Sequence, residues 1–332
     1  MATGNAGSAR TGTAPRRRRA VRAGAAVLLL TVTVPLAFRA AGADGVTPVP
    51  QLLAFLPWLP VPAGLGLVLS LAARWRPGLF WAAAALLVTA AFVRPYGGEA
   101  PAPHGPVRAH LRVLTANLEF GRAADGLLAT LRRERPDLVA VQECDPERCA
   151  AALDSAGVRA AYPFRLRAGH GASEGSAVLS RYPLTRDGAV AGELAMPRAA
   201  VTVAGQRLRF QVAHPMPPLP ASLDTWRTEL GRLRALAASR GHEPLIVAGD
   251  FNSSQDHAAF RAVLDTGLRD SARLAGLPRT PSWPTWTTLV LGAQIDHVLV
   301  SDALRPRAAH FLDLAHTDHR ALLVDLDLHA AR

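Results

Sequence analysis

The hydrophobic and polar positions divide the chain into an apolar N-terminal part and a mixed C-terminal part. Three long apolar runs follow one another over residues 23–43, 52–73 and 77–93. Each run is close to the ~20 residues that a helix needs to cross the hydrocarbon core of a bilayer. Because core helices of a water-soluble domain do not explain three such runs in succession, we expect a transmembrane region over 23–95 with about three helices.

Basic residues around these runs predict their orientation. Arginines cluster in residues 16–22 before the first run, and again at residues 74–76 between the second and third runs. The segment around Asp44 carries no basic residue. By the positive-inside rule, residues 1–22 form a basic, disordered cytoplasmic tail, and the chain after residue 96 lies outside the cell. The expected location is therefore the cell membrane, with several crossings.

Two alternatives to this topology stay open. The small residues Ala41-Gly42-Ala43 also fit the cleavage site of a signal peptide, and cleavage there would leave the C-terminal part outside. The uncharged stretch from Gly45 to Ala73, which contains the second run, has five prolines from Pro48 to Pro62, which makes the second crossing the weakest of the three. Loss of that crossing would place the C-terminal part in the cytoplasm.

A soluble domain over 111–332 follows a Pro- and Gly-rich linker over 96–110. Strand and helix patterns alternate along it, which predicts a layered domain of the α/β or mixed α+β class. The expected strands are Leu111–Ala116, Leu138–Gln142, Ser176–Ser180, Arg207–Ala213, Leu245–Ala248, Ile295–Val300 and Ala321–Leu328, and the expected helices are Arg122–Arg135, Asp224–Arg240 and Ala258–Leu264.

Polar side chains of catalytic character lie at the ends of these strands. Each one alone is most often a turn residue. If the strands lie side by side, however, their ends converge on one rim, where sites in sheets commonly form. The residues concerned are Asn117, Glu143, His214, Asp250, Asn252, Asp296, Asp318 and His319.

The chemistry of such a rim indicates a metal site for a hard cation. Glu143 and Asn117 offer oxygen ligands that suit Mg²⁺, with Mn²⁺ as the alternative. Cys144 and Cys149 do not have the spacing of a four-ligand zinc site. Outside the cytoplasm they could form a local disulfide, and two unpaired thiols fit the pattern equally well.

The remaining polar residues fit hydrolysis of a phosphoester by water. Asp250 can orient or deprotonate the water, and the two asparagines can donate hydrogen bonds to phosphate oxygens. His319 can stabilise phosphate charge, with Asp296 or Asp318 fixing its tautomer. His214 can contact phosphate or protonate the leaving group. The candidate catalytic residues are Asp250, His319, His214, Asn252, Asp296 and Asp318, and the candidate substrate-binding residues are Asn117, Asn252 and His214.

Seven ordered motifs carry a family resemblance over residues 111–328. They are ANLEF, PDLVAVQE, SAVLSRYPL, VAHP, VAGDFNSS, QIDHVLVS and TDHRALLVDL. This set resembles the endonuclease/exonuclease/phosphatase, or deoxyribonuclease I-like, superfamily. The resemblance implies a four-layer sandwich of two packed mixed β-sheets flanked by helices. The apolar N-terminal part looks like the anchor of membrane-attached members of actinobacterial type.

The same resemblance implies roles for individual residues. Glu143 matches the metal-binding glutamate of the family, and Asn117 matches the asparagine beside it. The Asp250–Asn252 pair matches the residues that position water and phosphate. The catalytic histidine is matched by His319, preceded by Asp318 and paired with Asp296, and the second histidine by His214. The last motif, TDHRALLVDL, departs from the family pattern at Arg320. This arginine is expected to add a basic residue near the mouth of the site, and Trp283 and Trp286 could also lie there.

Composition adds little to the choice of substrate. The net charge of +11 comes with arginine as the sole basic residue type besides histidine, and it does not by itself indicate a nucleic-acid surface. The favoured interpretation is an outward-facing Mg²⁺-dependent phosphoesterase with nuclease, sphingomyelinase-like or phosphatase activity. Extracellular DNA, a phospholipid headgroup and a small phosphoester all fit, and the partner of the N-terminal helices is the lipid bilayer, with no obligate protein partner evident. The alternatives are a non-catalytic scaffold that keeps the fold, and a cytoplasmic nuclease.

Overall fold

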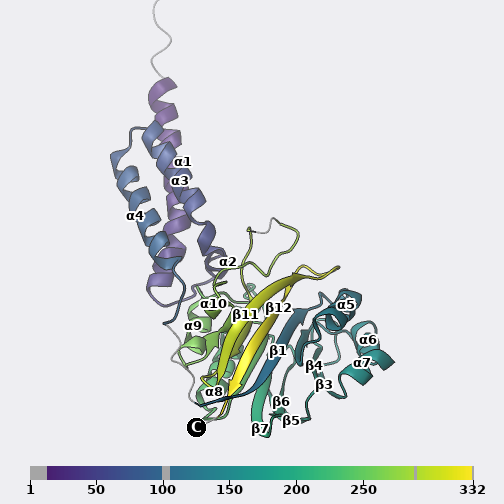
Figure 1. Ribbon diagram of the computed structural model, residues 1–332. Helices are drawn as coiled ribbons and strands as arrows, with labels where there is room; N and C mark the ends of the chain where they lie inside the picture. The colour runs from purple at the N-terminus through teal and green to yellow at the C-terminus, as the bar shows by residue number, and fades with distance from the viewer. Residues whose placement is uncertain (1–12, 99–104, 288–289, 331–332) are drawn as a thin grey trace, which may run out of the picture. The chain divides into compact units, whose positions relative to one another are not determined.

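The computed structural model describes residues 13–98, 105–287 and 290–330, so the N-terminal residues 1–12 and part of the expected linker lie outside the described residues (Figure 1). The chain divides into two compact units. One unit comprises Met1–Gly45 and Phe55–Arg94, and the other comprises Val46–Ala54 and Pro95–Arg332. We call them the helical unit and the catalytic unit. The short segment Val46–Ala54, which contains α2 (Val49–Ala54), therefore belongs to the catalytic unit although apolar helices precede and follow it.

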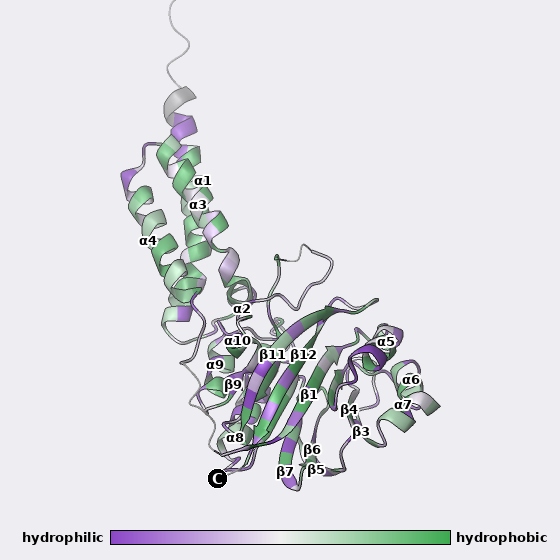
Figure 2. Cartoon of the chain, in the orientation of Figure 1, coloured by the Kyte–Doolittle hydropathy of each residue, from purple (hydrophilic) through white to green (hydrophobic). Residues whose placement is uncertain are grey.

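The helical unit is built from apolar helices that pack through small residues. Hydrophobic residues cover most of their length (Figure 2). Gly66 fits against the side chain of Leu29, where a Cβ would lie 2.9 Å from Leu29 Cδ2. The indole Nε1 of Trp81 donates a hydrogen bond to Thr33 Oγ1 at 2.8 Å. Close approach over small residues and interhelical hydrogen bonds are typical of helices that pack in a bilayer. The helices are α1 (Thr13–Ala40), the short 3₁₀ helix Leu56–Trp58, α3 (Pro60–Ala72) and α4 (Arg76–Phe92).

Among the described residues, one helix is both long and apolar enough to cross a membrane, over Arg16–Ala40. Length and composition alone support it, and a signal sequence or a buried core helix passes the same test. The expected second and third crossings correspond to shorter apolar helices, Leu56–Ala72 and Arg76–Phe92. The second is shorter than expected because the chain before it breaks at prolines, with Pro60 in the first turn of α3. The structure thus differs from the expectation of about three full-length spans.

The catalytic unit is a sandwich of two six-stranded mixed sheets (Figure 1). In each sheet the parallel pair is joined by a helical crossover: β1 to β2 through α5, and β7 to β8 through α8. The first sheet has the order β11 (Leu304–Asp313), β12 (Arg320–His329), β1 (Val107–Asn117), β2 (Leu138–Gln142), β4 (Ser176–Ser180) and β3 (Phe164–Ala168). The second has the order β5 (Leu184–Val190), β6 (Met196–Val203), β7 (Gln206–Ala213), β8 (Leu245–Asp250), β10 (Asp296–Val300) and β9 (Arg269–Asp270).

Helices cover the outer faces of both sheets, so the predicted four-layer sandwich is confirmed. Leu127 and Leu131 of α5 pack with Val139 on the first sheet. Trp226 of α8 packs with Val247 on the second sheet. The helices are α5 (Ala124–Glu134), α6 (Cys149–Leu153), α7 (Ala156–Ala161), α8 (Leu223–Ala238), α9 (Ala258–Leu264) and α10 (Ser271–Leu274).

Strand alternation turns the polar strand ends toward the layer between the sheets. On β8, Ile246 and Ala248 lie in the core between the sheets, so Asp250 points to the same side. On β10, Val298 lies in that core, and Asp296 points the same way. Asp250 and Asp296 are also direct partners in the β8–β10 register. The fold therefore brings these carboxylates together at one end of the sandwich.

Candidate functional site

The site is a cluster of buried polar residues at this end of the sandwich. Asn117 Nδ2 lies between two carboxylates and donates to Glu143 Oε1 at 3.0 Å and to Asp250 Oδ2 at 3.1 Å. Asp250 Oδ2 is in turn 3.7 Å from His319 Nε2. His319 Nδ1 is 2.8 Å from Asp296 Oδ2. Five of the predicted site residues thus form one continuous chain of contacts.

Local backbone geometry explains the Gly in the VAGDFNSS motif. β7 and β8 approach closely at Gly249, where a Cβ would lie 1.9 Å from the carbonyl oxygen of Ala213. A glycine is therefore needed for β8 to pair with β7 and deliver Asp250. Two polar residues that follow strands, Glu143 and Asn252, adopt left-handed backbone conformations with φ of 53° and 47°. Such strain at non-glycine residues is typical of functional sites.

The surroundings of His319 favour its positively charged form at neutral pH. Burial would lower its pKa, but attraction to Asp296 and Asp250 and the hydrogen bond to Asp296 outweigh burial and raise the pKa to about 10. The structure thereby selects Asp296 as the partner of Nδ1. Asp318 Oδ1 lies farther away, 3.9 Å from Nε2. His319 is therefore a buried cation aimed at Asp250.

The two carboxylates at the centre, those of Asp250 and Glu143, both have raised pKa values. Burial raises the pKa of Asp250, opposed by the attraction to His319. Burial also raises the pKa of Glu143, opposed by the hydrogen bonds from Asn117 Nδ2 and from the backbone N–H of Phe120. An ionised carboxylate with a raised pKa is a stronger base, so it accepts a proton more readily at neutral pH.

His214 lies at the same rim in the neutral form. Burial lowers its pKa to about 4, against the attraction of Asp250. Its Nε2 is 4.0 Å from Glu143 Oε1. Its Nδ1 is buried and has no hydrogen-bond partner among the described residues. A neutral imidazole suits hydrogen bonding to a substrate oxygen better than delivery of a proton to a leaving group.

Asn252, expected to donate hydrogen bonds to phosphate, makes two hydrogen bonds within the protein. Its backbone N–H donates to Asp250 Oδ1 at 2.7 Å, and its Nδ2 donates to the carbonyl oxygen of Pro215 at 2.9 Å. One of the two amide hydrogens is therefore used within the protein. The hydrogen bond from its backbone N–H orients the Asp250 carboxylate, so Asn252 also contributes to the site by positioning Asp250.

The sequence did not predict the supporting hydrogen bonds of three residues that hold this site together. The indole Nε1 of Trp283 donates to Asp318 Oδ2 at 2.8 Å, so this tryptophan orients an acidic group. Ser282 Oγ accepts the backbone N–H of Asp296 at 3.0 Å. Thr317 Oγ1 donates to the carbonyl oxygen of Asn117 at 3.0 Å and accepts the N–H of His319 at 3.1 Å. Their positions in loops gave no periodic signal, and only proximity to the QID and TDH motifs in sequence could have indicated them.

The expectation that Arg320 lies near the mouth of the site is wrong. Its side chain is buried, with Nε 2.9 Å from Asp313 Oδ1 and Nη1 donating to the carbonyl oxygen of Pro281. Arg320 is the first residue of β12, and the first five residues of this strand are all buried. Trp286, in contrast, is 77 % exposed.

A sequence profile of the endonuclease/exonuclease/phosphatase family matches residues 114–319, which include every residue of this site. The chain belongs to the endonuclease/exonuclease/phosphatase family. No curated protein matches its sequence.

Solved structures with the same fold cover about two thirds of the chain. D. rerio TDP2 complexed with a single-strand DNA product has a TM-score of 0.54 and 16 % identity, over 66 % of this chain and 99 % of that one. An endonuclease/exonuclease/phosphatase from Beutenbergia cavernae has a TM-score of 0.52 and 22 % identity, over 67 % and 72 %. An AP endonuclease from Archaeoglobus fulgidus has a TM-score of 0.53 and 17 % identity, over 64 % and 98 %. At these identities the likeness shows the fold of the family.

Members of the family typically use a divalent metal, and the donor set of this site fits one. Asp250, Asp296 and His319 place one ligand atom each within 4.8 Å of one another. His319, however, is cationic and bound to Asp296, so it would repel a metal. The carboxylate of Glu143 is the better donor, because hard divalent cations prefer oxygen ligands and it lies farther along the contact chain from His319. Asn117, expected as a ligand, is oriented differently: its Oδ1 accepts the N–H of Glu119 at 3.0 Å.

The two cysteines form a disulfide next to the site. Cys144–Cys149 links the residue that follows Glu143 to the start of α6. The backbone N–H of Cys144 also donates to the carbonyl oxygen of Gly175 at 2.8 Å. Of the two alternatives that the sequence left open, the structure has the disulfide, and it stiffens the turn that carries Glu143.

Proposed function

We propose that this protein is a membrane-anchored phosphoesterase that uses a divalent metal and hydrolyses a phosphodiester or phosphomonoester by attack of water. The observation that carries the proposal is the contact chain from Glu143 through Asn117 and Asp250 to the His319–Asp296 pair. A general base and a buried cation thus lie side by side at the rim of a rigid sandwich.

The residues divide the work by their charge states. Asp250 accepts the proton of the attacking water, since burial raises its pKa and Asn252 holds its other oxygen. The His319 imidazolium stabilises negative charge that grows on the phosphoryl group. Asp296 holds that imidazolium in place and charged. His214 donates a hydrogen bond to a phosphate oxygen as a neutral imidazole.

The proposed metal is Mg²⁺, with Mn²⁺ as the alternative, held by the carboxylate of Glu143, while the carboxylate of Asp250 accepts the proton of the water. Such an ion would supply further electrostatic stabilisation of the phosphate charge. Asn117 then serves as the donor that keeps the two carboxylates at a fixed separation.

The proposed location is the cell membrane, with the catalytic unit outside the cell. The two apolar helices after α1 span 17 residues each, Leu56–Ala72 and Arg76–Phe92, which is the lower limit for crossing a bilayer. The arginines in the first part of α1 and those at residues 74–76, where α4 begins, are the basis for assigning the cytoplasmic side. Fusions of a periplasm-active and a cytoplasm-active reporter after Val93 test this topology; activity of the cytoplasmic reporter would contradict it.

Hydrolysis of bis-(p-nitrophenyl) phosphate by the full chain tests the chemistry. We expect activity with Mg²⁺ that is lost with Asp250→Asn. No hydrolysis with any divalent metal, together with metal binding by calorimetry that Glu143→Ala abolishes, would favour a non-catalytic binding protein instead. DNA, sphingomyelin and phosphoinositide vesicles, assayed in parallel, separate the substrate classes, with DNA first because the related fold of D. rerio TDP2 was solved with a DNA product.

A further inference from the structure

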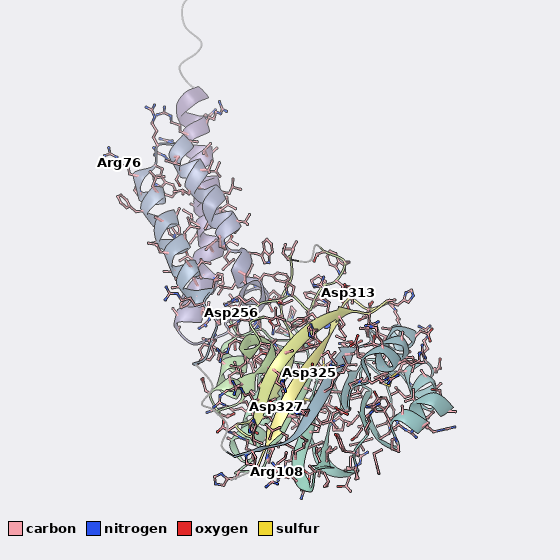
Figure 3. All side chains as sticks on the ribbon, in the orientation of Figure 1. Arg76, Arg108, Asp256, Asp313, Asp325 and Asp327 are labelled. Atoms are coloured by element: carbon pink, nitrogen blue, oxygen red, sulfur yellow. A yellow bond between two sulfur atoms is a disulfide. The ribbon has the colours of Figure 1, made fainter. Side chains whose placement is uncertain are left out.

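The loop after β8 is buried to an unusual degree for a surface connection. Ser253 and Asp256 are fully buried, and His257 is 1 % exposed. The loop begins at Asn252, whose backbone N–H orients Asp250. Its position in the catalytic unit is marked by the labelled Asp256 in Figure 3. Whatever fixes this loop therefore also fixes the general base.

Some of the groups that fix the loop come from within the family fold. Trp226 Nε1 donates to Ser253 Oγ at 3.0 Å. His297 Nε2 donates to the carbonyl oxygen of Ser253 at 2.9 Å, with Nδ1 bonded to Asp270 at 2.7 Å. These contacts hold the first half of the loop from the side of α8 and β10.

The second half is held by residues from outside the family match. His257 Nδ1 accepts the backbone N–H of Ser254 at 2.9 Å, so the proton resides on Nε2, which donates to the carbonyl oxygen of Pro50 at 2.8 Å. The backbone N–H of Tyr96 donates to Gln255 Oε1 at 2.7 Å. Pro50 and Tyr96 lie outside residues 114–319. Pro50 belongs to the segment between α1 and α3, and Tyr96 belongs to the segment after α4; both segments are part of the catalytic unit.

The same N-terminal segment also contacts the loop after β7. Gln51, on α2, donates through Nε2 to the carbonyl oxygen of Pro218 at 2.5 Å. That loop follows His214 and includes Pro215, whose carbonyl oxygen accepts Asn252 Nδ2. Residues 50–51 and Tyr96 thus contact the loop after β7, which carries His214, and the loop after β8, which carries Asn252.

We propose that the segment between α1 and α3 and the segment after α4 form a clamp on the catalytic loops, and that His257 and Gln51 are positioning residues for Asp250, Asn252 and His214. The inference rests on the proposed phosphoesterase function for its kinetic test only. The clamp couples the apolar helices to catalysis, because the chain that leads from α1 to α3 and the chain that leaves α4 complete the support of the site. A displacement of about 1 Å in a catalytic group can cost about a hundredfold in rate.

The test uses full-length protein in detergent with the substitution His257→Phe, which keeps an aromatic ring against Trp226 and removes both ring hydrogen bonds. We expect kcat for bis-(p-nitrophenyl) phosphate to fall about tenfold to a hundredfold, with KM changed less than threefold. His257→Gln, which keeps a donor for Pro50, should recover part of the loss. His242→Phe, at an exposed histidine of the same unit, is the matched control and should keep the wild-type rate.

Hydrogen exchange of residues 252–257 gives a readout that does not need activity. We expect faster exchange in His257→Phe, and in Gln51→Leu faster exchange in the loops after β7 and β8. If His257→Phe fails to fold, Gln51→Leu decides by the same two measurements. Wild-type kcat and wild-type exchange in the folded variants would overturn the clamp. Absence of wild-type hydrolysis, with exchange altered as expected, would overturn the proposed function and leave the clamp standing.

Discussion

His319 Nδ1 lies 2.8 Å from Asp296 Oδ2, and both side chains are almost completely buried. The second oxygen of Asp296, Oδ1, is buried without a hydrogen-bond partner among the described residues. The negative charge of Asp296 is therefore directed at the imidazole, which explains why His319 keeps its proton despite burial. In this account, Asp296 acts on the reaction through His319.

Removing the negative charge of Asp296 should lower the rate of hydrolysis. Asp296→Asn is expected to lower kcat by a hundredfold or more, because a neutral His319 no longer stabilises the phosphoryl charge. The pH profile of kcat should also change, with the limb assigned to His319 moving to lower pH. Steady-state kinetics between pH 5 and 10 measure both effects. Asp302→Asn, at an exposed aspartate, is the matched control, and equal rates in the two variants would contradict the assignment.

The neutral state of His214 predicts how stability depends on pH. Burial lowers its pKa from 6.5 to about 4, so the unfolded state binds the proton more strongly between these values. The stability that depends on neutral His214 is present above about pH 6.5 and is lost as the pH falls toward 4, by up to about 3 kcal/mol. Urea unfolding in EDTA at pH 7 and pH 4.5 measures the loss, and His214→Gln should show a smaller one. An unchanged pH dependence in that variant would contradict the buried neutral form.

Gly249 should tolerate no side chain. Gly249→Ala places a Cβ 1.9 Å from the carbonyl oxygen of Ala213, so β7 and β8 must separate, and we expect a loss of about 3 kcal/mol or more. Gly241→Ala is the control, because that glycine has φ of 63° and open space around a Cβ. It should cost about 1 kcal/mol from backbone strain alone. Unfolding midpoints of the two variants compare the two costs, and equal losses would show that the strand contact is unimportant.

The metal that hydrolysis requires should bind through the carboxylate of Glu143. EDTA is expected to abolish hydrolysis, and Mg²⁺ or Mn²⁺ should restore it. Glu143→Gln should weaken metal binding at least tenfold, because a neutral amide replaces the carboxylate ligand. Isothermal calorimetry with Mn²⁺ measures the affinity, and Glu147→Gln, at an exposed glutamate four residues away, is the control. Wild-type affinity in Glu143→Gln would place the metal elsewhere.

Most of the inner strands were predictable from the sequence, although β6 was missed, and the edge strands were not predicted. β2 and β4 are buried at every position, so each appears as a continuous apolar run with clear limits. β5 has the sequence LTRDGAV and is mostly exposed, and a strand of this kind has no hydrophobic pattern. α2 also escaped prediction, because its six residues are part of an apolar run that otherwise forms membrane-type helices. Its place in the catalytic unit depends on tertiary contacts.

The residues that carry charge chemistry were predictable because they follow strands that the core fixes. Asp250 and Asp296 each extend a buried strand by one step of its alternation. The residues that support them were not, since Ser282, Thr317 and Trp283 act from loops through hydrogen bonds that only the folded chain creates. Arg320 was misplaced for a related reason, because its partner Asp313 lies across the β11–β12 pair.

The most direct test of the central claim is the rate of bis-(p-nitrophenyl) phosphate hydrolysis by full-length protein with Mg²⁺, measured for the wild type, His319→Gln and His310→Gln. His310 is an exposed histidine on β11 of the same sandwich. The account predicts hydrolysis by the wild type and by His310→Gln, and a loss of at least a hundredfold in His319→Gln with its fold retained. Equal rates in His319→Gln and His310→Gln would contradict it.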